Sequence, residues 1–411
     1  MLELSQRIAS DDFARLARHP DHPRAFTRHR LLPLPALIAT LLSMRNQSQQ
    51  AMLDGFQASV RGHEGPLRGV SDRAFAKARD RLHQPALVAL NDWLVQRAEA
   101  AGRVARWCGL RVVAGDASAM MPAVRICRLR HGTAAGAQRL FALYLPGAEL
   151  TLHASLHSAC LAERSMLVEA LDALGPDDVL VLDRGYPAAW LVALLNAKGI
   201  RFVMRCDNDS GWAALTAFMR SGTAEADVTL KPPSARDARD WGCPATAPAL
   251  RLVRQIAPNG QQRVLATNVD ALRYPAASFG DLYHQRWRIE EAFKRLKHRL
   301  HLEAVSGLSQ QALIIDVAAK VLADNLASLM CAAAADDAGL AARSRKCNRS
   351  YAAVALQRAL PRLLLAIGDV AATLADLLAR LGGTSQRFIP HRSRPRPARH
   401  VKPHPSCAYK G

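Results

Sequence analysis

The order of strand-like and helix-like segments in the middle of the chain constrains the fold more than any other feature. Three runs with strand character follow one another at 110–114, 139–145 and 149–156, the last two joined by a Pro-Gly turn. A helical pattern, a short apolar strand at 179–182, a second helical pattern and a strand at 201–204 come next. Three strands followed by helix, strand, helix, strand predict a mixed α/β sheet, in which the first and fourth strands can be neighbours.

Two aspartates come at the ends of strands in this predicted sheet. Asp116 closes the first strand and Asp183 closes the fourth. A carboxylate just past a buried strand projects at the edge of the sheet, where α/β proteins generally form their sites. Either aspartate alone is more often an ordinary turn-forming or helix-capping residue. A functional interpretation therefore needs the two to meet and a third group to join them.

A charged segment near residue 290 supplies that third group. On one helix, Tyr283, Arg286, Glu290 and Lys297 fall within a strip of roughly 60°, and the adjacent apolar strip can pack on a core. Such a helix by itself is usually a solvated face. Together with the two aspartates, however, Glu290 completes three carboxylates of the kind that hold magnesium or manganese. Two such ions can activate a hydroxyl and stabilise the leaving oxygen of a phosphodiester.

The charge of the chain indicates a polyanionic partner. The 411 residues carry a net charge of +20 and have a pI near 10.3, and the cations run through the whole chain, so nucleic acid is the leading partner and an anionic membrane surface the weaker one. The longest mostly apolar run, 31–44, is too short for a membrane span, and no secretory signal is visible. We therefore expect a cytoplasmic protein without a membrane partner.

A basic stripe in the N-terminal region is a candidate for DNA contact. Ser71 is placed to cap a helix over 72–83, whose apolar residues would face inward. Arg73, Lys77 and Arg81 then recur at four-residue spacing on the outer face, as a helix lying against DNA requires. The alternative is an ordinary solvated surface, which basic stripes form more often.

Changes in hydrophobic periodicity and in composition divide the chain into segments. Alternating runs at 250–256 and 263–267, separated by Pro258-Asn259-Gly260, predict a hairpin. Long apolar helices are predicted at 312–332 and 352–381. The expected organisation is a helical DNA-binding region at 1–105, the first part of a catalytic core at 106–206, a β-rich insertion at 207–280, the rest of the core at 281–330, a helical region at 331–383 and a basic disordered tail at 384–411.

In the charged segment 283–297 the chain resembles the DDE transposases of the insertion sequence four family, whose signature is Tyr-(2)-Arg-(3)-Glu-(6)-Lys. The resemblance covers about residues 30–330, and the turn at 183–186 also looks like the family's. One departure is Asp116-Ala117-Ser118, where the family usually has Asp-Gly-Thr or Asp-Gly-Ser. Four residues match the signature at every step: Tyr283, Arg286, Glu290 and Lys297.

The resemblance implies an RNase H-like core interrupted by the β insertion, with two Mg²⁺ ions, for which Mn²⁺ can substitute, at Asp116, Asp183 and Glu290. It further implies nicking at element ends, attack of a 3′-hydroxyl to form a hairpin, hairpin opening, and joining to target DNA. The implied partners are double-stranded DNA, as terminal inverted repeats and target, and a second copy of the chain. A bacterial, nucleoid-associated location comes with them.

Residue roles also follow from the resemblance. Tyr283 and Arg286 would contact DNA near the cleavage site, and Lys297 would approach a phosphate. Members of the family often stack a flipped base on an aromatic side chain in the insertion, for which Trp212 and Trp241 are candidates. Two alternatives stay open: a catalytically inactive DNA-binding protein derived from such an element, and a structure-specific RNase H-like nuclease without strand transfer.

Overall fold

Two compact units make up the chain. The computed structural model describes residues 1–27, 32–43, 48–122, 128–129, 132–133, 137–206, 211–256, 260 and 262–389. The first unit, called here the helical unit, comprises Met1–Gln96, Met120–Gln138 and Lys294–Gly411. The second, the sheet unit, comprises Arg97–Ala119 and Arg139–Phe293. Each is described by itself.

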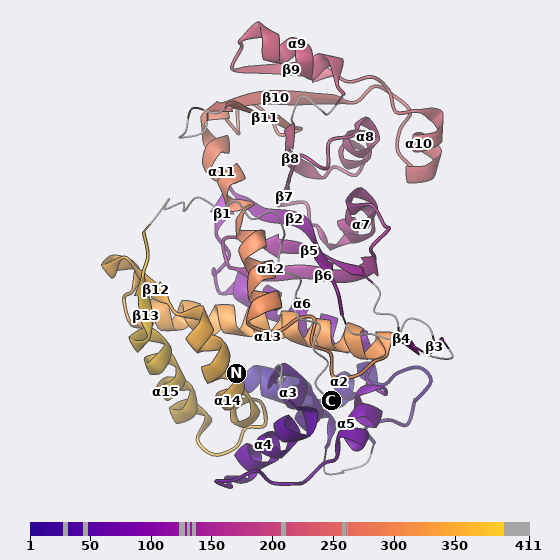
Figure 1. Cartoon of the computed structure of the whole chain (residues 1–411). Coiled ribbons are helices and arrows are strands. Elements are labelled where there is room, and N and C mark those ends of the chain that lie inside the picture. Colours follow the sequence, from indigo (N-terminus) through magenta and orange to yellow (C-terminus); the bar gives the residue numbers. More distant parts are fainter. Residues whose placement is uncertain are drawn as a thin grey trace. The chain divides into compact units, whose positions relative to one another are not determined.

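One mixed sheet forms the body of the sheet unit. Its strands follow one another in the order β6-β5-β2-β7-β8-β11-β10-β9, with the short β1 paired to β2 (Figure 1). Because hydrogen bonds connect every neighbour in this order, the sheet is continuous. The strands are β1 (Arg106–Trp107), β2 (Leu110–Met120), β5 (Gln138–Leu145), β6 (Leu150–Ser158), β7 (Asp178–Leu182), β8 (Arg201–Cys206), β9 (Glu225–Thr229), β10 (Ala249–Ile256) and β11 (Gln262–Thr267).

The centre of the sheet confirms the predicted fold class. β2 pairs in parallel with β7, and β7 in parallel with β8, so the first and fourth predicted strands are neighbours as expected. All five residues of β7 are buried, which suits a Val- and Leu-rich strand covered on both faces. In chain order the strands β2, β5, β6, β7 and β8 are arranged 3-2-1-4-5, the order of an RNase H-like core.

The segment predicted as a β-rich insertion extends this same sheet. β11 pairs antiparallel with β8, and β10 pairs antiparallel with both β11 and β9, which confirms the predicted hairpin. Pro258 and Asn259 lie outside the described residues, while Gly260 has φ +78°, a conformation that favours glycine. The insertion also contains two helices, α9 (Ala213–Ser221) and α10 (Ala235–Trp241).

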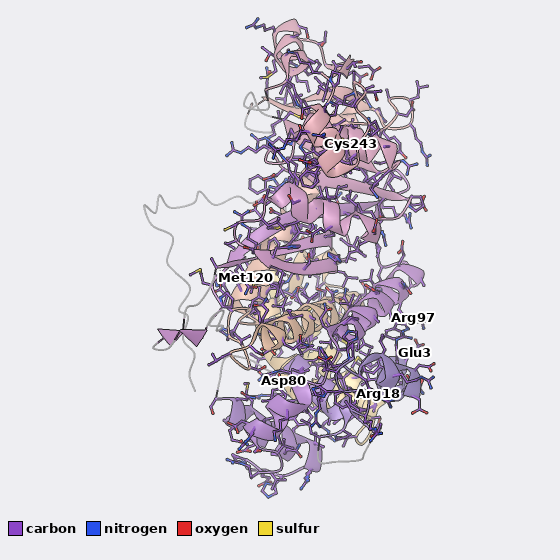
Figure 2. The ribbon with its side chains drawn as sticks, turned by 90° about the vertical axis from the view of Figure 1, so that its right-hand side faces the viewer. Glu3, Arg18, Asp80, Arg97, Met120 and Cys243 are labelled. Atoms are coloured by element: carbon purple, nitrogen blue, oxygen red, sulfur yellow. The ribbon has the colours of Figure 1, made fainter. Side chains whose placement is uncertain are left out.

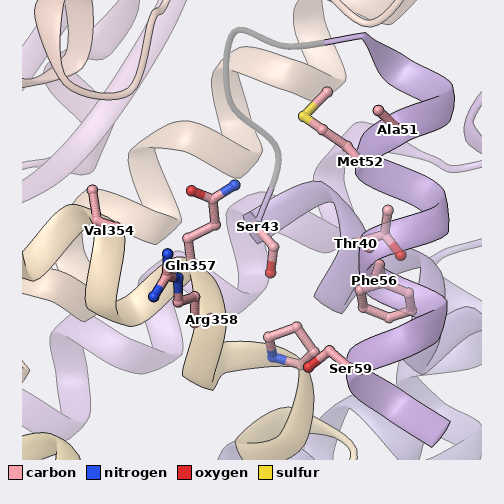
Figure 3. A pocket seen from close by; sticks show the side chains of 11 residues that line it. Thr40, Ser43, Ala51, Met52, Phe56, Ser59, Val354, Gln357 and Arg358 are labelled. Atoms are coloured by element: carbon pink, nitrogen blue, oxygen red, sulfur yellow. The ribbon is translucent and has the colours of Figure 1, made fainter. Parts of the chain in front are cut away.

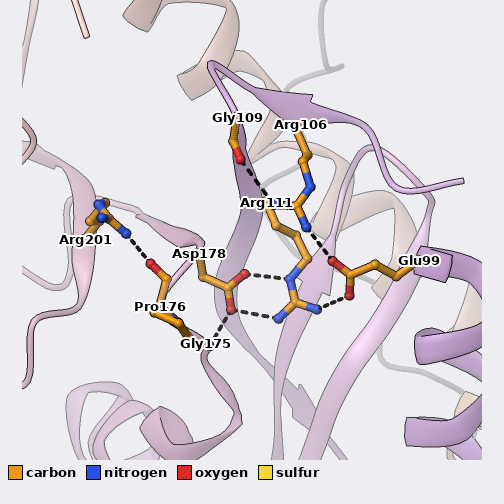
Figure 4. Close-up of polar contacts among 8 residues, drawn as sticks. All are labelled: Glu99, Arg106, Gly109, Arg111, Gly175, Pro176, Asp178 and Arg201. Carbon is orange, nitrogen blue, oxygen red and sulfur yellow. Dashed lines mark hydrogen bonds and ion pairs between the residues drawn. The ribbon is translucent and has the colours of Figure 1, made fainter. Parts of the chain in front are cut away.

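An arginine fixes the register of the two strands that carry the aspartates. Arg111 and Asp178 are directly paired residues of β2 and β7. The guanidinium donates from Nε to Asp178 Oδ1 at 2.5 Å and from Nη2 to Oδ2 at 2.8 Å, and its Nη1 donates to Glu99 Oε2 at 3.0 Å (Figure 4). Such a bidentate pair is geometrically specific. It therefore favours one alignment of β2 with β7.

The N-terminal part of the helical unit is helical, as predicted. Its helices are α1 (Leu2–Ala9), α2 (Asp11–Leu16), α3 (Leu34–Ser43), α4 (Gln49–Arg61), α5 (Asp72–Arg79) and α6 (Gln84–Ala100). The segments after α2 and after α5 are joined by a bridge between Arg18 and Leu82; Figure 2 labels Arg18 and Asp80 in this region. Ser71 caps α5 by accepting a hydrogen bond from the Ala74 amide, which confirms the predicted start of that helix.

The C-terminal helices differ from the prediction in two places. One continuous helix was expected over 352–381, but α14 (Arg349–Leu364) and α15 (Val370–Gly383) are separate, with Ala366 at φ +50° and Gly368 at φ +69° between them. The second difference is at the predicted tail, because β13 (Ser385–Arg387) pairs with β12 (Arg345–Cys347). Residues 390–411 lie outside the described part of the chain.

A long helix, α13 (Gln310–Asp337), confirms the apolar helix predicted at 312–332. Its Asp324 accepts hydrogen bonds from Arg295 Nε and Nη2, and both side chains are buried. Such a buried pair holds its two helices together only while both partners remain. Among the described residues, no helix has the length and apolar character needed to cross a membrane.

Gly382 permits the close approach of α15 to α13. A Cβ atom at this position would lie 2.8 Å from Ala338 Cβ and 3.1 Å from the Ala334 carbonyl oxygen, whereas Gly383 has open space around it. Gly382→Ala is therefore expected to lower the free energy of unfolding by about 1–3 kcal/mol through overpacking. Gly383→Ala, the matched control, is expected to be neutral or slightly stabilising. Urea denaturation measures both, and equal effects of the two changes would contradict this explanation.

Candidate active site

Asp116 and Asp183 come together because of the alignment of β2 with β7. The last directly paired residues of the two strands are Ala114 and Val181, and each aspartate lies two residues beyond its strand's member of that pair. Asp116 is located within β2, which continues to Met120, rather than at the strand end as predicted. Asp183 follows the end of β7, and its Oδ1 accepts a hydrogen bond from the Gly185 amide at 2.8 Å.

The carboxylate of Asp116 lies in an environment that disfavours its charge. Burial raises its pKa from 3.8 to about 7; Arg286 and the Ala117 amide oppose this shift, and the charges of Asp183 and Glu163 add to it. Its side chain is 17% exposed. An acidic group with a pKa near neutrality beside other carboxylates is typical of a functional site.

The signature residues lie on two helices instead of one. α11 (Phe279–Gln285) carries Tyr283, α12 (Arg288–His298) carries Glu290, and Arg286 lies in the turn between them. The single continuous helix that we predicted is therefore wrong, although Arg286 and Glu290 still meet across one helical turn. In this turn the backbone hydrogen bonds span three residues instead of four: the Arg286 amide donates to the Tyr283 carbonyl, and the Ile289 amide donates to the Arg286 carbonyl. The chain is therefore wound more tightly here than in an α-helix.

Arg286 lies between two of the predicted carboxylates. Its Nη1 is 3.6 Å from Asp116 Oδ2, and its Nη2 donates to Glu290 Oε1 at 3.3 Å. Burial lowers the pKa of this guanidinium, but its anionic neighbours outweigh burial, and the net direction is upward. After burial, the neighbours that shift it are Tyr283, Asp116, Asp183 and Glu290. The sheet unit thus gathers all three predicted carboxylates around one cation.

Glu163 is a fourth carboxylate at this place, and the sequence analysis missed it. It begins α7 (Glu163–Ala170), pairs with Arg139 at 3.3 Å, and its pKa is raised by burial and by the charge of Asp183. A Cβ atom on Gly185 would lie 3.1 Å from Asp183 Oδ1 and 4.0 Å from Glu163 Oε2. An acidic residue in the first turn of a helix is common, so nothing in the sequence singles it out.

Tyr186 adds a buried hydroxyl next to the carboxylates. Its side chain is fully buried, and its Oη has no hydrogen-bond partner among the described residues. Burial raises the pKa of this phenol well above its usual value, and the charges of Asp116, Glu163 and Asp183 raise it further. Tyr186 ends the turn that the sequence analysis connected to the signature, and Arg164 holds that turn by donating to the carbonyls of Gly185 and Pro187.

The other predicted DNA-binding residues have different surroundings. Lys297 lies in the last turn of α12, in the part of that helix that belongs to the helical unit. Arg73, Lys77 and Arg81 are exposed, as predicted. However, α5 ends at Arg79, so Arg81 lies two residues past the helix instead of on it.

The two tryptophans predicted as candidates for base stacking differ in their surroundings. Trp241, on α10, stacks on Trp190 with ring centroids 4.3 Å apart, so it already has an aromatic partner. Trp212 is the residue immediately before α9 and is half-buried. A third tryptophan, Trp287, was not among the predicted candidates; it is 43% exposed and has the Arg286 guanidinium carbon 5.8 Å from its ring centroid.

The donors at this site suit a divalent cation in kind. Carboxylate oxygens are the ligands that magnesium and manganese prefer, and a nearby cation would favour the charged form of Asp116. In the arrangement described, the guanidinium of Arg286 lies between Asp116 and Glu290. Within the described part of the chain, no three acidic, histidine or cysteine side chains lie close enough together to hold a metal ion.

A separate cavity lies in the helical unit. It has a volume of about 420 Å³ and is formed by residues of α3, α4 and α14, among them Thr40, Phe56 and Arg358 (Figure 3). Its lining is mostly apolar and hydroxyl-bearing. It therefore does not offer the carboxylate chemistry found in the sheet unit.

Comparison with known proteins identifies a family for the middle of the chain. Residues 123–326, just under half of the chain, match the family described as transposase DDE domain. No curated protein matches the sequence. Among solved structures, the chain is similar to a cryo-EM structure of the piggyBac transposase synaptic complex with hairpin DNA, with a TM-score of 0.42 and 9% identity, over 95% of this chain and 86% of that chain.

The matched segment begins after Asp116 and contains Asp183 together with the whole Tyr-Arg-Glu-Lys signature. By this match, residues 123–326 are similar to a transposase DDE domain.

Proposed function

We propose that this protein is a cut-and-paste transposase that cleaves element ends through a hairpin intermediate and joins them to target DNA. The observation that carries the proposal is the grouping of Asp116, Asp183 and Glu290 around Arg286 in the sheet unit. Asp116, Asp183 and Glu290 would hold two Mg²⁺ ions, for which Mn²⁺ can substitute. When bound, these ions supply an activated hydroxyl and a stabilised leaving oxygen.

The remaining roles follow from the chemistry of the side chains. Arg286 can bind a phosphate bidentately, and Lys297 supplies a point charge to another. Tyr283 is buried beside Arg286, with the guanidinium carbon 6.0 Å from its ring, so it would orient that arginine and contact DNA near the cleavage site. The protein would act as a homodimer on the terminal inverted repeats, in the nucleoid of a bacterial cytoplasm.

The test is cleavage of a duplex that carries the terminal repeats flanking the gene. The full chain is incubated with this duplex in Mg²⁺, in Mn²⁺ and in EDTA, and the products are separated on denaturing gels. A metal-dependent nick followed by a hairpin, and then joining to a second duplex, is the expected result. Tight binding without cleavage in either metal would instead indicate the DNA-binding relic, and cleavage without joining would indicate the nuclease.

The exposed basic residues of α5 are proposed to contact the DNA backbone. Arg73 and Lys77 are both exposed. The double change Arg73→Gln/Lys77→Gln is expected to reduce the slope of log K against log salt by about 2, because each lost phosphate contact removes about one unit. Arg15→Gln, an exposed arginine of the same unit paired with Asp12, is the control and should leave the slope unchanged. An unchanged slope in the double variant would mean that this surface is simply solvated.

A further inference from the structure

The arginine at the centre of the site has a position that the proposed catalytic function does not explain. Arg286 is only 7% exposed, and its two terminal nitrogens point to different acidic residues, Asp116 at 3.6 Å and Glu290 at 3.3 Å. A residue whose only role is to bind a DNA phosphate is expected to be exposed to solvent, where the DNA can reach it. Here the cation instead neutralises the carboxylates that the proposed function assigns to metal.

We propose that Arg286 is an internal counter-cation that competes with divalent metal for Asp116 and Glu290, and that a DNA phosphate releases it. This inference rests on the proposed function of the site. Without DNA, the guanidinium holds the two carboxylates and weakens metal binding. When a phosphate approaches, it offers Arg286 a bidentate partner, so the carboxylates become available. Metal binding and DNA binding are then coupled, and each strengthens the other by the same factor.

The guanidinium is incompletely satisfied where it lies. Its Nε is buried and has no hydrogen-bond partner among the described residues, and a buried donor without a partner is unfavourable. The Nη1 contact with Asp116, at 3.6 Å, is longer than a good hydrogen bond. A bound phosphate could provide the missing acceptor. Movement of Arg286 from the carboxylates to a phosphate would therefore supply the hydrogen-bond acceptor that its Nε lacks.

The surroundings of Arg286 also provide contacts that do not depend on Asp116 or Glu290. Its guanidinium carbon lies 6.0 Å from the Tyr283 ring and 5.8 Å from the Trp287 ring, within the range of cation–π interaction. Trp287 is 43% exposed. Arg286 thus has one neighbour at the protein surface, where DNA can approach, and two in the carboxylate cluster.

The experiment measures Mn²⁺ binding to the full chain without DNA, by the electron paramagnetic resonance signal of free Mn²⁺. Arg286→Met removes the cation and keeps an unbranched apolar side chain in place of the arginine stem, and it is expected to bind Mn²⁺ about tenfold or more tightly than the parent, in line with typical couplings between sites. Arg106→Met is the control, because Arg106 also pairs with a carboxylate of the sheet unit, Glu99 at 2.8 Å. It should leave Mn²⁺ affinity unchanged.

Two further arms make the result specific. Adding Glu290→Gln to Arg286→Met should abolish the gain in Mn²⁺ affinity, since the gained site would then lack a ligand. Duplex carrying the terminal repeats should raise Mn²⁺ affinity about tenfold or more in the parent and much less in Arg286→Met.

If circular dichroism shows that Arg286→Met does not fold, Arg286→Lys serves instead, because an ammonium cannot bridge two carboxylates as a guanidinium does. An intermediate gain in Mn²⁺ affinity is then expected.

The outcomes separate this inference from the proposed function. Equal Mn²⁺ affinity of the parent and the arginine variant, with metal-dependent cleavage by the parent, would overturn the counter-cation role and leave the transposase assignment intact. A parent that neither cleaves nor binds Mn²⁺ with DNA present would overturn both.

Discussion

Glu290→Gln is expected to reduce metal-dependent cleavage by at least about a thousandfold, as the loss of a central catalytic group typically does. The change replaces a carboxylate with an amide of the same shape at the position held by Arg286. DNA affinity should change by less than about threefold, because the basic surfaces remain and one negative charge is removed. Cleavage is measured on denaturing gels and affinity by fluorescence anisotropy with the same labelled duplex.

The matched control for this variant is Glu291→Gln. Glu291 is the next residue of α12 and is exposed, so the substitution is chemically identical but lies outside the carboxylate cluster. It should cleave like the parent. Equal activity of Glu290→Gln and the parent would remove Glu290 from the catalytic set, and an equal loss in both variants would indicate a general effect on α12.

The parts of the fold that sequence predicts well are those fixed by local patterns. The run Val179 to Leu182 indicates a buried strand because it is short, wholly apolar and half valine. Ser71 indicates a helix cap because its hydroxyl can accept an amide hydrogen bond. The order of elements allowed β2 and β7 to be neighbours, and the structure shows that they are. The spacing of Tyr283, Arg286 and Glu290 then pointed to the region where Asp116 and Asp183 lie.

What sequence did not predict depends on contacts between distant residues. The break between α11 and α12 occurs at Arg286, whose side chain contacts Asp116, 170 positions earlier, and helical periodicity gives no sign of it. Glu163 joins the site through the turn at Gly185, so only the folded chain shows its proximity. Likewise, the insertion extends the sheet because β11 pairs with β8, a pairing that alternation alone does not specify.

The break between α14 and α15 has a different cause. Apolar residues continue through the segment 352–381, so the pattern favours one helix. Gly368 has φ +69°, which suits glycine, but Ala366 also adopts φ +50°, which an alanine rarely does. Packing of the two helices within the helical unit must therefore stabilise that conformation.

Asp116→Asn is expected to make the metal-free protein more stable at pH 8 by up to about 4 kcal/mol. Burial raises the pKa of Asp116 from 3.8 to about 7, and each unit is equivalent to about 1.4 kcal/mol. The folded state keeps the proton through the window from about pH 4 to pH 7, while the unfolded state loses it, so stability falls as pH rises across that window. Asparagine carries no charge, so this loss should be absent in the variant.

The measurement is urea denaturation of both proteins in EDTA at several pH values. Near pH 4 the two should differ little, and above pH 7 the variant should be the more stable; loss of the ion pair with Arg286 offsets part of the gain, although Glu290 remains a partner. Asp177→Asn, an exposed aspartate of the same unit, should show no such trend. A variant less stable than the parent at pH 8 would mean that Asp116 is a net stabilising charge. The expected result would instead show that the Asp116 carboxylate destabilises the fold. Such a cost is typical of a group that is retained for function.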